Sequence, residues 1–403
     1  MSAPPLAGIR VLDLTRVLAG PWCTMTLGDM GAEIIKVENP GTGDDTRPWG
    51  TAMPGGERTY FLAANRNKQS IAIDLAHPEG QALIRALAEK SDVLVENFKL
   101  DGLKKYGLDY PSLATVNPRL IYCSISGYGR TGPAAARAGY DFIIQGEAGL
   151  MSITGERDDV PGGGPQKVGV AVTDIMTGMY ATQAILAALI ARDANGHGQF
   201  LDMSLYDCLL ANMANMASYA LNTGKVPLRY GNAHQDIVPY QTFRTSDGDV
   251  IVSVGNNGQY QKFCRDVLGR PDLADDPRFA TNPLRVANRA ACVAAIGAVM
   301  ATRTRDEWLA LMERFQVPGG AVRNLVEALA APETAARDMV YAMPHSTEGT
   351  VRNAGSPLKF SATPVQEPVA PPLLGQHTDA VLAGALGLDA TRIAALRAAG
   401  AVA

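Results

Sequence analysis

One aspartate, Asp174, stands alone in the long apolar segment QKVGVAVTDIMTGMYATQAILAALIAR, residues 166–192. The pattern predicts a helix that ends at Asn195 and Gly196, so Asp174 could simply be its N-cap or first-turn acid. An aspartate with an ordinary pKa of about 3.9 is ionised at pH 7 and can attack a carbonyl without a neighbouring base. The two roles are compatible, because a helix N-terminus stabilises and orients a carboxylate by about 0.3–1 kcal/mol.

Other common catalytic patterns are missing from the sequence. It contains no HExxH, GxSxG or P-loop motif, and its five histidines are too dispersed to suggest a metal site. Its five cysteines form no CxxC pair, which favours reduced thiols in the core over disulfides or a zinc site. We therefore expect no metal and no tightly bound cofactor, and we assign any catalysis to a carboxylate.

Residues 127–132 read GYGRTG, a formal match to the GxGxxG fingerprint of dinucleotide-binding folds. That fingerprint belongs to the first strand–helix turn and leads into a long helix. Here it follows about the fifth expected strand and continues into PAAARAGYD, which predicts no long helix. We interpret it as a glycine turn that lets the backbone approach a ligand or another chain, not as an NAD or FAD site.

Short β-branched runs alternate with helical patterns in the first part of the chain, which is typical of a parallel α/β sheet. The expected strands are IRVLDLT, AEIIKVE, SIAIDL, DVLVEN and RLIYCSIS. The clearest helix between them, HPEGQALIRALAEKS, carries Pro78 near its first turn. We expect the face formed by Leu83, Ile84, Leu87 and Ala88 to pack on the sheet.

A chain of 403 residues is long for one core, so we predict two domains. Residues 1–222 form a large domain, to which an extended, proline-rich segment and two short helices in residues 341–403 return. Residues 223–340 form a smaller domain. It contains the strand pair YQTFRTSDGDVIVSV, the loop GNNGQ and a helix from about Gln259.

The charge pattern bears on partners and location. The 36 Lys and Arg against 40 Asp and Glu leave a net charge of −4 and no basic block, which argues against a nucleic-acid partner or a polybasic membrane contact. No apolar run reaches the ~20 residues of a membrane span, and the N-terminus lacks a signal-peptide pattern. We expect a soluble, cytoplasmic protein whose partners are small molecules.

Several segments become recognisable when they are taken together and in order from about residue 8 onwards. They are GIRVLDLTRVLAGPWCTMTLGDMGAEIIKVENPGTGDDTR, FLAANRNKQSIAIDL, VLVENF, SGYGRTGP, AGYDFI, the segment around Asp174, GNNGQ and LLGQHTDAVL. The chain resembles the class III CoA-transferases, the superfamily of formyl-CoA transferase, carnitine CoA-transferase and α-methylacyl-CoA racemase. The resemblance implies an α/β fold with a large Rossmann-like domain, a smaller α+β domain, a returning C-terminal segment, and a homodimer of interlocked rings.

The resemblance also implies a reaction. In these transferases an aspartate at the position of Asp174 attacks an acyl-CoA thioester to give a mixed anhydride, and the released thiolate then forms an aspartyl-CoA thioester. Acyl-CoA and a small carboxylic acid are the substrates. A lid loop that keeps water from the intermediates corresponds to Gly255, Asn256, Asn257, Gly258 and Gln259, although an ordinary turn has the same composition.

For CoA, the resemblance points to the first strand–helix turn, Val17, Leu18 and Ala19, just before Gly20 and Pro21 open a helix. Further CoA-binding candidates are Ile73, Asn97, Phe98, Lys99, Lys105, Tyr106, Arg137 and Tyr140. The two lysines could contact phosphate oxygens, or they could belong to a solvated basic face.

Two departures bear on the substrate. Formyl-CoA transferases have glutamine where this chain has Leu18 and a run of glycines where it has GNNG, which argues against oxalate and formyl-CoA. The motifs RVLAGP and GNNGQ are more similar to members that move CoA among succinate, glutarate, malate or citramalate, so succinyl-CoA or a similar donor is expected. Arg16 and Arg47 could then bind the distal carboxylate, or either could pair with a local acid.

The main alternative is an isomerase of the α-methylacyl-CoA racemase type, which pairs the equivalent aspartate with the histidine of a GHD triplet. Here the triplet is Gly139, Tyr140 and Asp141. A tyrosine, with a pKa of about 10 in place of about 6.5, removes one partner from a two-base proton exchange. The sequence therefore favours a transferase over the racemase. A protein that only binds CoA would need Asp174 to be only a cap.

Overall fold

The computed structural model describes residues 3–403, which group into two compact units. The first unit consists of the chain up to Leu150, Lys167–Lys225 and Pro332–Ala403. The second consists of Met151–Gln166 and Val226–Ala331. Residues 151–166 thus group with the second unit, although they lie inside the range expected for the large domain. The CoA-binding and lid roles assigned to the two domains stay predictions.

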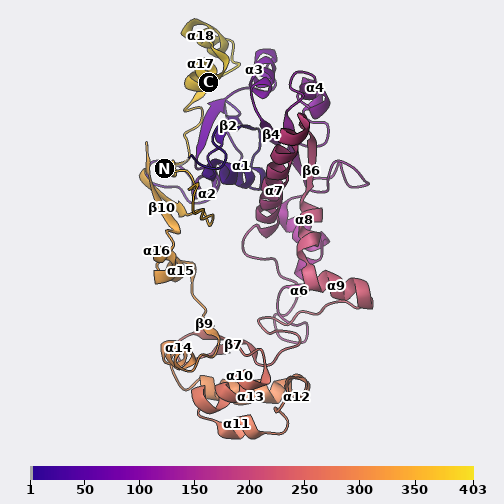
Figure 1. Ribbon diagram of the computed structural model, residues 1–403, viewed down its shortest axis with the longest axis vertical. Coiled ribbons are helices and arrows are strands. Elements are labelled where there is room, and N and C mark those ends of the chain that lie inside the picture. The colour runs from indigo at the N-terminus through magenta and orange to yellow at the C-terminus, as the bar shows by residue number, and fades with distance from the viewer. Residues whose placement is uncertain (1–2) are drawn as a thin grey trace. The chain divides into compact units, whose positions relative to one another are not determined.

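A six-stranded parallel sheet, in the order β3-β2-β1-β4-β5-β6, is the centre of the first unit (Figure 1). Its strands are β1 Arg10–Asp13, β2 Glu33–Glu38, β3 Lys68–Ala72, β4 Val93–Glu96, β5 Ile121–Ser126 and β6 Phe200–Ser204. The first five confirm the strands expected from the sequence. The sixth was not expected, because FLDMS at the sheet edge is half exposed and lacks a continuous apolar run.

Helices cover both faces of this sheet. Successive residues of a strand point to opposite faces, so each strand contributes apolar side chains to two cores. Leu12 of β1 lies in the apolar core with α3 (Pro78–Glu89), α17 (Thr378–Leu386) and α18 (Ala390–Ala398). Val11, the preceding residue, lies in the core with α1 (Ala19–Asp29) and α7 (Val172–Asn195). Within α3 the buried residues include the predicted face, Leu83, Ile84, Leu87 and Ala88.

Helix α7 confirms the helix predicted around Asp174, and Gly196 ends it in the left-handed conformation at φ 80°. By length and composition it is apolar enough to cross a membrane. Its residues Ala181, Ile185 and Ala188 pack in the core with α1, as in the central helix of an α/β unit. A cytoplasmic location stays a prediction.

The remaining elements of the first unit are short. They are α2 Thr59–Ala63, the 3-10 helix η1 Lys104–Tyr106, α4 Tyr110–Ala114, α5 Asp141–Glu147, α8 Leu205–Asn212, α9 Ala214–Thr223, α16 Pro332–Ala336, and the antiparallel hairpin of β10 Val340–His345 and β11 Gly349–Ala354. The hairpin lies in a stretch that we expected only to be extended. At the C-terminus Val402 pairs with Ile73 beyond β3, which attaches the end of the chain to the sheet.

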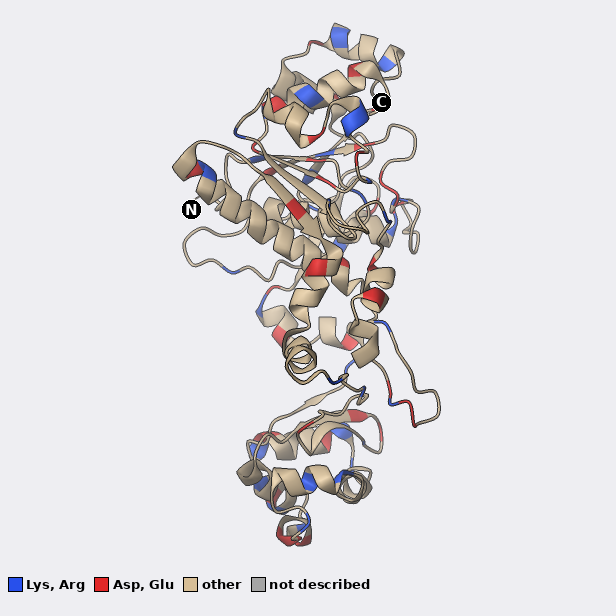
Figure 2. Ribbon diagram, turned by 90° about the vertical axis from the view of Figure 1, so that its right-hand side faces the viewer, with Lys and Arg blue, Asp and Glu red and all other residues tan. Residues whose placement is uncertain are grey.

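The second unit contains a three-stranded antiparallel sheet, β7-β8-β9, with a core that includes Trp308 and Phe263. Its elements are α6 Leu150–Ile153, whose first residue belongs to the first unit, β7 Tyr240–Arg244, β8 Asp249–Ser253, α10 Asn257–Lys262, the π-helix η2 Phe263–Val267, α11 Pro271–Asp275, α12 Asn282–Ala287, α13 Arg289–Met300, α14 Arg305–Arg314, β9 Gly319–Ala321 and α15 Leu325–Leu329. The two predicted strands of this region are confirmed as β7 and β8. Acidic and basic residues are interspersed along each unit (Figure 2).

Buried charges lie beneath the end of β1. The Lys68 ammonium contacts the Asp13 carboxylate at 3.1 Å, and the Lys36 ammonium contacts Asp44 at 2.8 Å; all four side chains are buried. Lys36 also donates to the carbonyl oxygen of Thr15 at 2.9 Å. Burial alone would raise the pKa of Asp13, but the charges of the two lysines, together with hydrogen bonds from the Thr15 and Thr24 hydroxyls, outweigh it and lower the pKa to about 2. These pairs fix the chain just after β1.

We predict that Asp13→Ala lowers the free energy of unfolding by about 3–5 kcal/mol, because it leaves Lys68 buried without its partner. Urea unfolding measures this loss. Glu33→Ala is the matched control: it breaks the more exposed ion pair with Arg10 and is expected to cost about 1 kcal/mol or less. Equal losses for the two variants would show that the buried pair is no more important than the exposed one.

Candidate active site

A crevice opens at the carboxyl ends of β1 and β4, where the strand order of the sheet reverses. In open parallel sheets this is where ligands bind, because the loops after the two strands diverge. The crevice is lined by Arg16–Ala19 after β1, Asn97–Leu100 after β4, Ile125–Gly127 at the end of β5, Arg130, Ala135–Tyr140, Asp45, Asp174 and Leu205.

The turn after β1 has a constrained backbone. Val17 has φ 72°, a left-handed conformation that a β-branched residue rarely adopts. Its N–H donates to Asp44 Oδ1 at 3.2 Å, and the Asn97 side chain exchanges two hydrogen bonds with the backbone of Arg16, at 3.0 and 2.7 Å. Helix α1 begins directly afterwards at Ala19. Hydrogen bonds thus attach this turn both to the buried Asp44 and to Asn97, the residue that follows β4.

Asp174 lies in the first turn of α7 and is not its cap. A carboxylate from another helix takes that role: Asp141 of α5 accepts a hydrogen bond from the Thr173 N–H at 2.8 Å. The fully buried Gln145 holds this acid, because its amide nitrogen donates to Asp141 at 2.7 Å and its amide oxygen accepts from the Val168 N–H at 2.8 Å. Asp174 is therefore not needed to complete the helix end.

The Asp174 carboxylate is partly buried, and no side chain or backbone group of residues 3–403 forms a hydrogen bond or ion pair with it. Burial, together with the charge of Asp141, raises its pKa to about 7. Our expectation that Asp174 is almost wholly ionised at pH 7 was therefore wrong, because it assumed a solvated carboxyl. The pKa of the Tyr60 hydroxyl is raised as well, first by burial and then by the charges of Asp174 and Asp141.

Most of the predicted site residues line this single crevice. They are Arg16, Val17, Leu18, Ala19, Asn97, Phe98, Lys99, Arg137, Tyr140 and Asp174. Ile73 and Tyr106 line a neighbouring cavity, which shares Arg16 and Phe98 with the crevice. Lys105 lies outside both cavities, with its ammonium 4.5 Å from the centre of the Tyr106 ring.

The two arginines considered for a distal carboxylate differ. Arg47 lies outside the crevice, forms a two-pronged ion pair with Glu38 at 2.7 and 2.7 Å, and stacks on Phe61, so a local acid already occupies it. Arg16 lines the crevice and pairs with the half-exposed Asp45 at 3.2 Å. Its Nε is buried without a partner among residues 3–403. Of these two arginines, only Arg16 is placed to meet a substrate in this crevice.

The predicted lid segment belongs to the second unit and is mostly a helix start. Helix α10 begins at Asn257, two residues earlier than expected, since the Asn256 side chain caps it by accepting from the Gln259 N–H at 2.9 Å. The Gln259 side chain in turn accepts from the Gly255 N–H at 2.8 Å. A Cβ atom at Gly258 would meet no heavy atom closer than 3.4 Å. The lid role stays a prediction.

Sequence reasoning missed three groups near the crevice. Asp141 was read only as part of the GYD triplet, and nothing in the sequence indicated that it caps a helix 30 residues further on. Tyr60 is remote in sequence from Asp174. Arg130 belongs to the GYGRTG turn, whose glycines gave the one available signal. Among residues 3–403, no group of His, Cys, Asp and Glu is arranged to hold a metal ion.

Comparison with known proteins identifies the family. Residues 6–378 match the family described as CoA-transferase family III. The chain belongs to this family. As a class III CoA-transferase it is an enzyme that acts on acyl-CoA, and the match covers nearly the whole chain.

Three similar proteins support the assignment. The succinate–glutarate CoA-transferase of Agrobacterium fabrum is 47% identical over 386 residues, which cover 94% of this chain and 95% of that protein. The human succinyl-CoA:glutarate CoA-transferase is 43% identical over 398 residues, covering 99% and 90%. A crystal structure of a CaiB/BaiF family protein from Brucella suis superposes with a TM-score of 0.87 at 46% identity, covering 95% of this chain and 100% of that one.

We predict that Asp141→Asn lowers the pKa of Asp174 from about 7 towards the usual range. The asparagine oxygen can still accept from Thr173, but the charge that disfavours ionisation of Asp174 is gone. Carboxyl carbon NMR titration of the folded protein measures the pKa. Asp45→Asn, on the crevice rim, is the control and is expected to change it less. An unchanged pKa in Asp141→Asn would show that burial alone sets it.

The same group should make stability depend on pH. The folded-state pKa of Asp174 is about 7 against an ordinary value of 3.8, so its contribution is fully present below about pH 4 and is lost as the pH rises through about 7. The asparagine of Asp174→Asn cannot ionise, so this variant does not lose folding stability at this position as the pH rises. We therefore expect Asp174→Asn to stabilise the fold more at pH 8 than at pH 5, as measured by urea unfolding at both pH values. A difference independent of pH would contradict the raised pKa.

Proposed function

We propose that this enzyme transfers CoA from succinyl-CoA to a dicarboxylic acid, with glutarate as the first acceptor to test, and that Asp174 carries the covalent intermediates. The observation that carries the proposal is an unpaired carboxylate on the first turn of α7, inside the crevice at the switch point of the sheet. The names of the Agrobacterium fabrum and human relatives support the substrates.

The proposed reaction exchanges activated acyl groups. An oxygen of the ionised Asp174 attacks the thioester carbonyl, which forms a mixed anhydride and releases the CoA thiolate. The thiolate attacks the Asp174 carbonyl carbon, which gives an aspartyl-CoA thioester and frees the donor acid. The acceptor carboxylate attacks this thioester, and the released thiolate then attacks the acceptor carbonyl of the new anhydride. The product acyl-CoA leaves, and Asp174 is again a carboxylate.

The surroundings of Asp174 fit this role. A carboxylate with a raised pKa is a stronger base, and by Brønsted behaviour a better nucleophile once it is ionised. The N-terminus of α7 favours the negative charge through the helix dipole. The start of α1, next to Leu18, presents further backbone N–H groups to the crevice, where they can meet an anionic part of CoA.

Arg16 is the residue that we propose for the distal carboxylate of the dicarboxylic acid. Its exposed pair with Asp45 is weakly held, and its unpartnered Nε can donate to a bound anion. Arg47 is not proposed for this role, because its guanidinium is already paired with the Glu38 carboxylate. Within the described part of the chain no histidine lines the crevice, so no observation favours the racemase.

We further propose that the protein forms an interlocked homodimer in the cytoplasm. Large apolar side chains are exposed on three helices of the first unit: Phe142 on α5 is 58% exposed, Met179 on α7 51% and Leu221 on α9 85%. We propose that the partner chain covers these side chains.

The covalent route is tested by trapping. Given succinyl-CoA, no acceptor and hydroxylamine, the enzyme should form a hydroxamate on the peptide that bears Asp174 and none on peptides bearing Asp141 or Asp202, because only an acylated carboxyl reacts under mild conditions. Mass spectrometry of the peptides locates the adduct.

Asp174→Ala should fold, since Asp141 supplies the helix cap, and it should lose transfer to glutarate by at least a thousandfold. Asp193→Ala, an exposed acid near the other end of α7, is the matched control and should keep wild-type turnover. If no adduct forms and the kinetics require both acids to bind before CoA leaves, the acceptor attacks directly and Asp174 has another role.

A further inference from the structure

Arg16, the arginine proposed for the distal carboxylate, already has a carboxylate partner within its own chain. Its Nη1 contacts Asp45 Oδ2 at 3.2 Å, and both side chains line the crevice. Among residues 3–403, the acids that line this crevice are Asp45 and the proposed nucleophile Asp174. The chain thus places an acid at the group that is expected to receive the second carboxylate of the substrate.

The backbone on both sides of this pair is fixed. Asn97 exchanges two hydrogen bonds with the backbone of Arg16, whose guanidinium lies 5.1 Å from the centre of the Phe98 ring. On the other side, Asp44 and Thr46 are buried, and the Asp44 carboxylate accepts from the N–H and the hydroxyl of Thr46 at 2.9 and 2.8 Å. The two charged side chains are therefore presented by anchored backbone and can separate without moving it.

The contact between the two side chains is weak. The side chains of Arg16 and Asp45 are 42% and 50% exposed, and water screens the attraction between charges in such a setting. Asp45 has no other hydrogen bond or ion pair with residues 3–403. A carboxylate that meets a guanidinium through two parallel hydrogen bonds makes a stronger contact than this single one. A substrate carboxylate can therefore take Arg16 from Asp45, which then returns to water.

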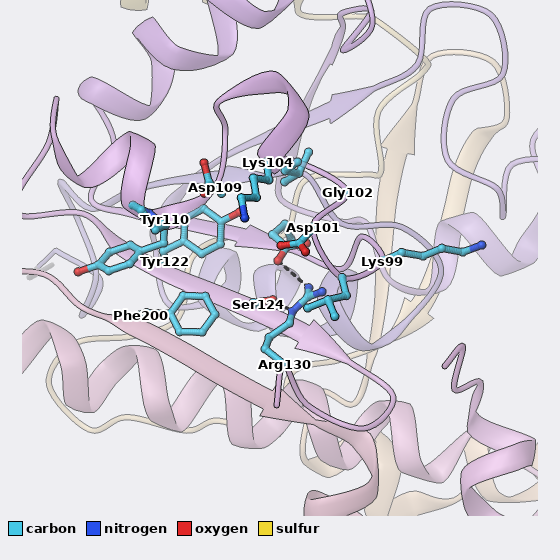
Figure 3. Close-up of a pocket in the computed structure, with 14 residues that line it drawn as sticks. Lys99, Asp101, Gly102, Lys104, Asp109, Tyr110, Tyr122, Ser124, Arg130 and Phe200 are labelled. Atoms are coloured by element: carbon cyan, nitrogen blue, oxygen red, sulfur yellow. Dashed lines mark hydrogen bonds and ion pairs between the residues drawn. The ribbon is translucent and has the colours of Figure 1, made fainter. Parts of the chain in front are cut away.

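Arg130, another arginine of the crevice, is held more firmly. It donates to the Glu96 carboxylate at 2.7 Å and to the Ser124 hydroxyl (Figure 3), and its side chain is 12% exposed. The Glu96 carboxylate also accepts from the Phe98 N–H at 2.7 Å. Opening a buried pair of this kind is costly, because each partner would be left unpaired away from water. Arg130 is therefore not free to exchange partners.

Arg137 also lines the crevice and offers the closest comparison with Arg16. Its contact with Glu147, at 2.6 Å, joins two side chains that are 54% and 41% exposed. Glu147 is held in addition by the Tyr128 hydroxyl, which donates to it at 2.7 Å. Asp45 has no second contact of this kind. The pair of Arg16 and Asp45 is thus the most easily opened of the three.

We propose that Asp45 is an internal competitor for Arg16, which the distal carboxylate of a dicarboxylic acid displaces and which pairs with Arg16 again when the acid leaves. This inference rests on the proposed function and adds a specificity residue to it. A monocarboxylic acid would use its one carboxylate at Asp174 and could not make the exchange, so the pair disfavours it. The donor and acceptor acids use the subsite in turn, and the return of Asp45 helps the first to leave.

The exchange is tested at equilibrium by calorimetry, with glutarate titrated into the full-length protein saturated with CoA. Asp45→Asn keeps the shape of the side chain but removes the competing charge. It should bind glutarate about fivefold more tightly, roughly what one weak surface ion pair contributes. Pentanoate, of the same chain length with one carboxyl group, should gain nothing from the variant. Glu147→Gln removes the acid beside Arg137 and is the matched control, with glutarate binding as in the wild type.

A second background shows whether the effect passes through Arg16. Arg16→Ala should weaken glutarate binding by at least tenfold, and adding Asp45→Asn should then give no gain. The inference is overturned if the wild type does not bind glutarate, if Asp45→Asn binds it no more tightly, or if pentanoate gains equally. It is also overturned if the gain persists without Arg16 or appears in Glu147→Gln. No acyl transfer occurs in these titrations, so their outcome is separate from hydroxamate formation on Asp174.

Discussion

The buried charges below β1 are the constraint on which the rest of the crevice depends. Lysine and aspartate side chains removed from water must stay paired, since an unpaired charge in the core costs several kcal/mol. Lys36 holds both Asp44 and the Thr15 carbonyl, and Asp44 in turn accepts from the Val17 N–H. The unusual backbone of Val17 is therefore imposed from inside the core. Its left-handed conformation persists because moving it would break the hydrogen bond to Asp44, which the buried Lys36 holds in place.

A second constraint relates α1 to α7. A Cβ atom at Gly178 would lie 2.6 Å from the Ala19 carbonyl oxygen, so the start of α1 can approach α7 closely only because this residue is a glycine. The first turn of α7, four residues before Gly178, therefore stands beside the turn after β1. This contact brings Asp174 into the same crevice as Val17 and Leu18, which are more than 150 residues away in the sequence.

The sequence predicted what depends on local pattern. Strands β1 to β5, the apolar face of α3 and the end of α7 at Gly196 follow from periodicity and from glycine, and they were predicted correctly. Properties that depend on distant neighbours were not accessible in this way. The pKa of Asp174 depends on burial and on the charge of Asp141. The ion pair of Arg47 with Glu38, which leaves Arg47 unavailable to a substrate, depends on the folding of a loop. Strand β6 is half exposed at a sheet edge and lacks the pattern of a buried strand.

The cap that Asp141 provides has a consequence for an enzyme whose side chain changes its chemical identity in every cycle. In the proposed reaction Asp174 alternates between a charged carboxylate, an anhydride and a neutral thioester. Were it also the N-cap, each acylation would remove a hydrogen bond worth about 1 kcal/mol and loosen the helix that aims it. Since Asp141 and Gln145 hold the helix end, α7 keeps the same geometry whatever is attached to Asp174. The helix that carries the nucleophile is thus held in place by residues that take no part in the covalent steps.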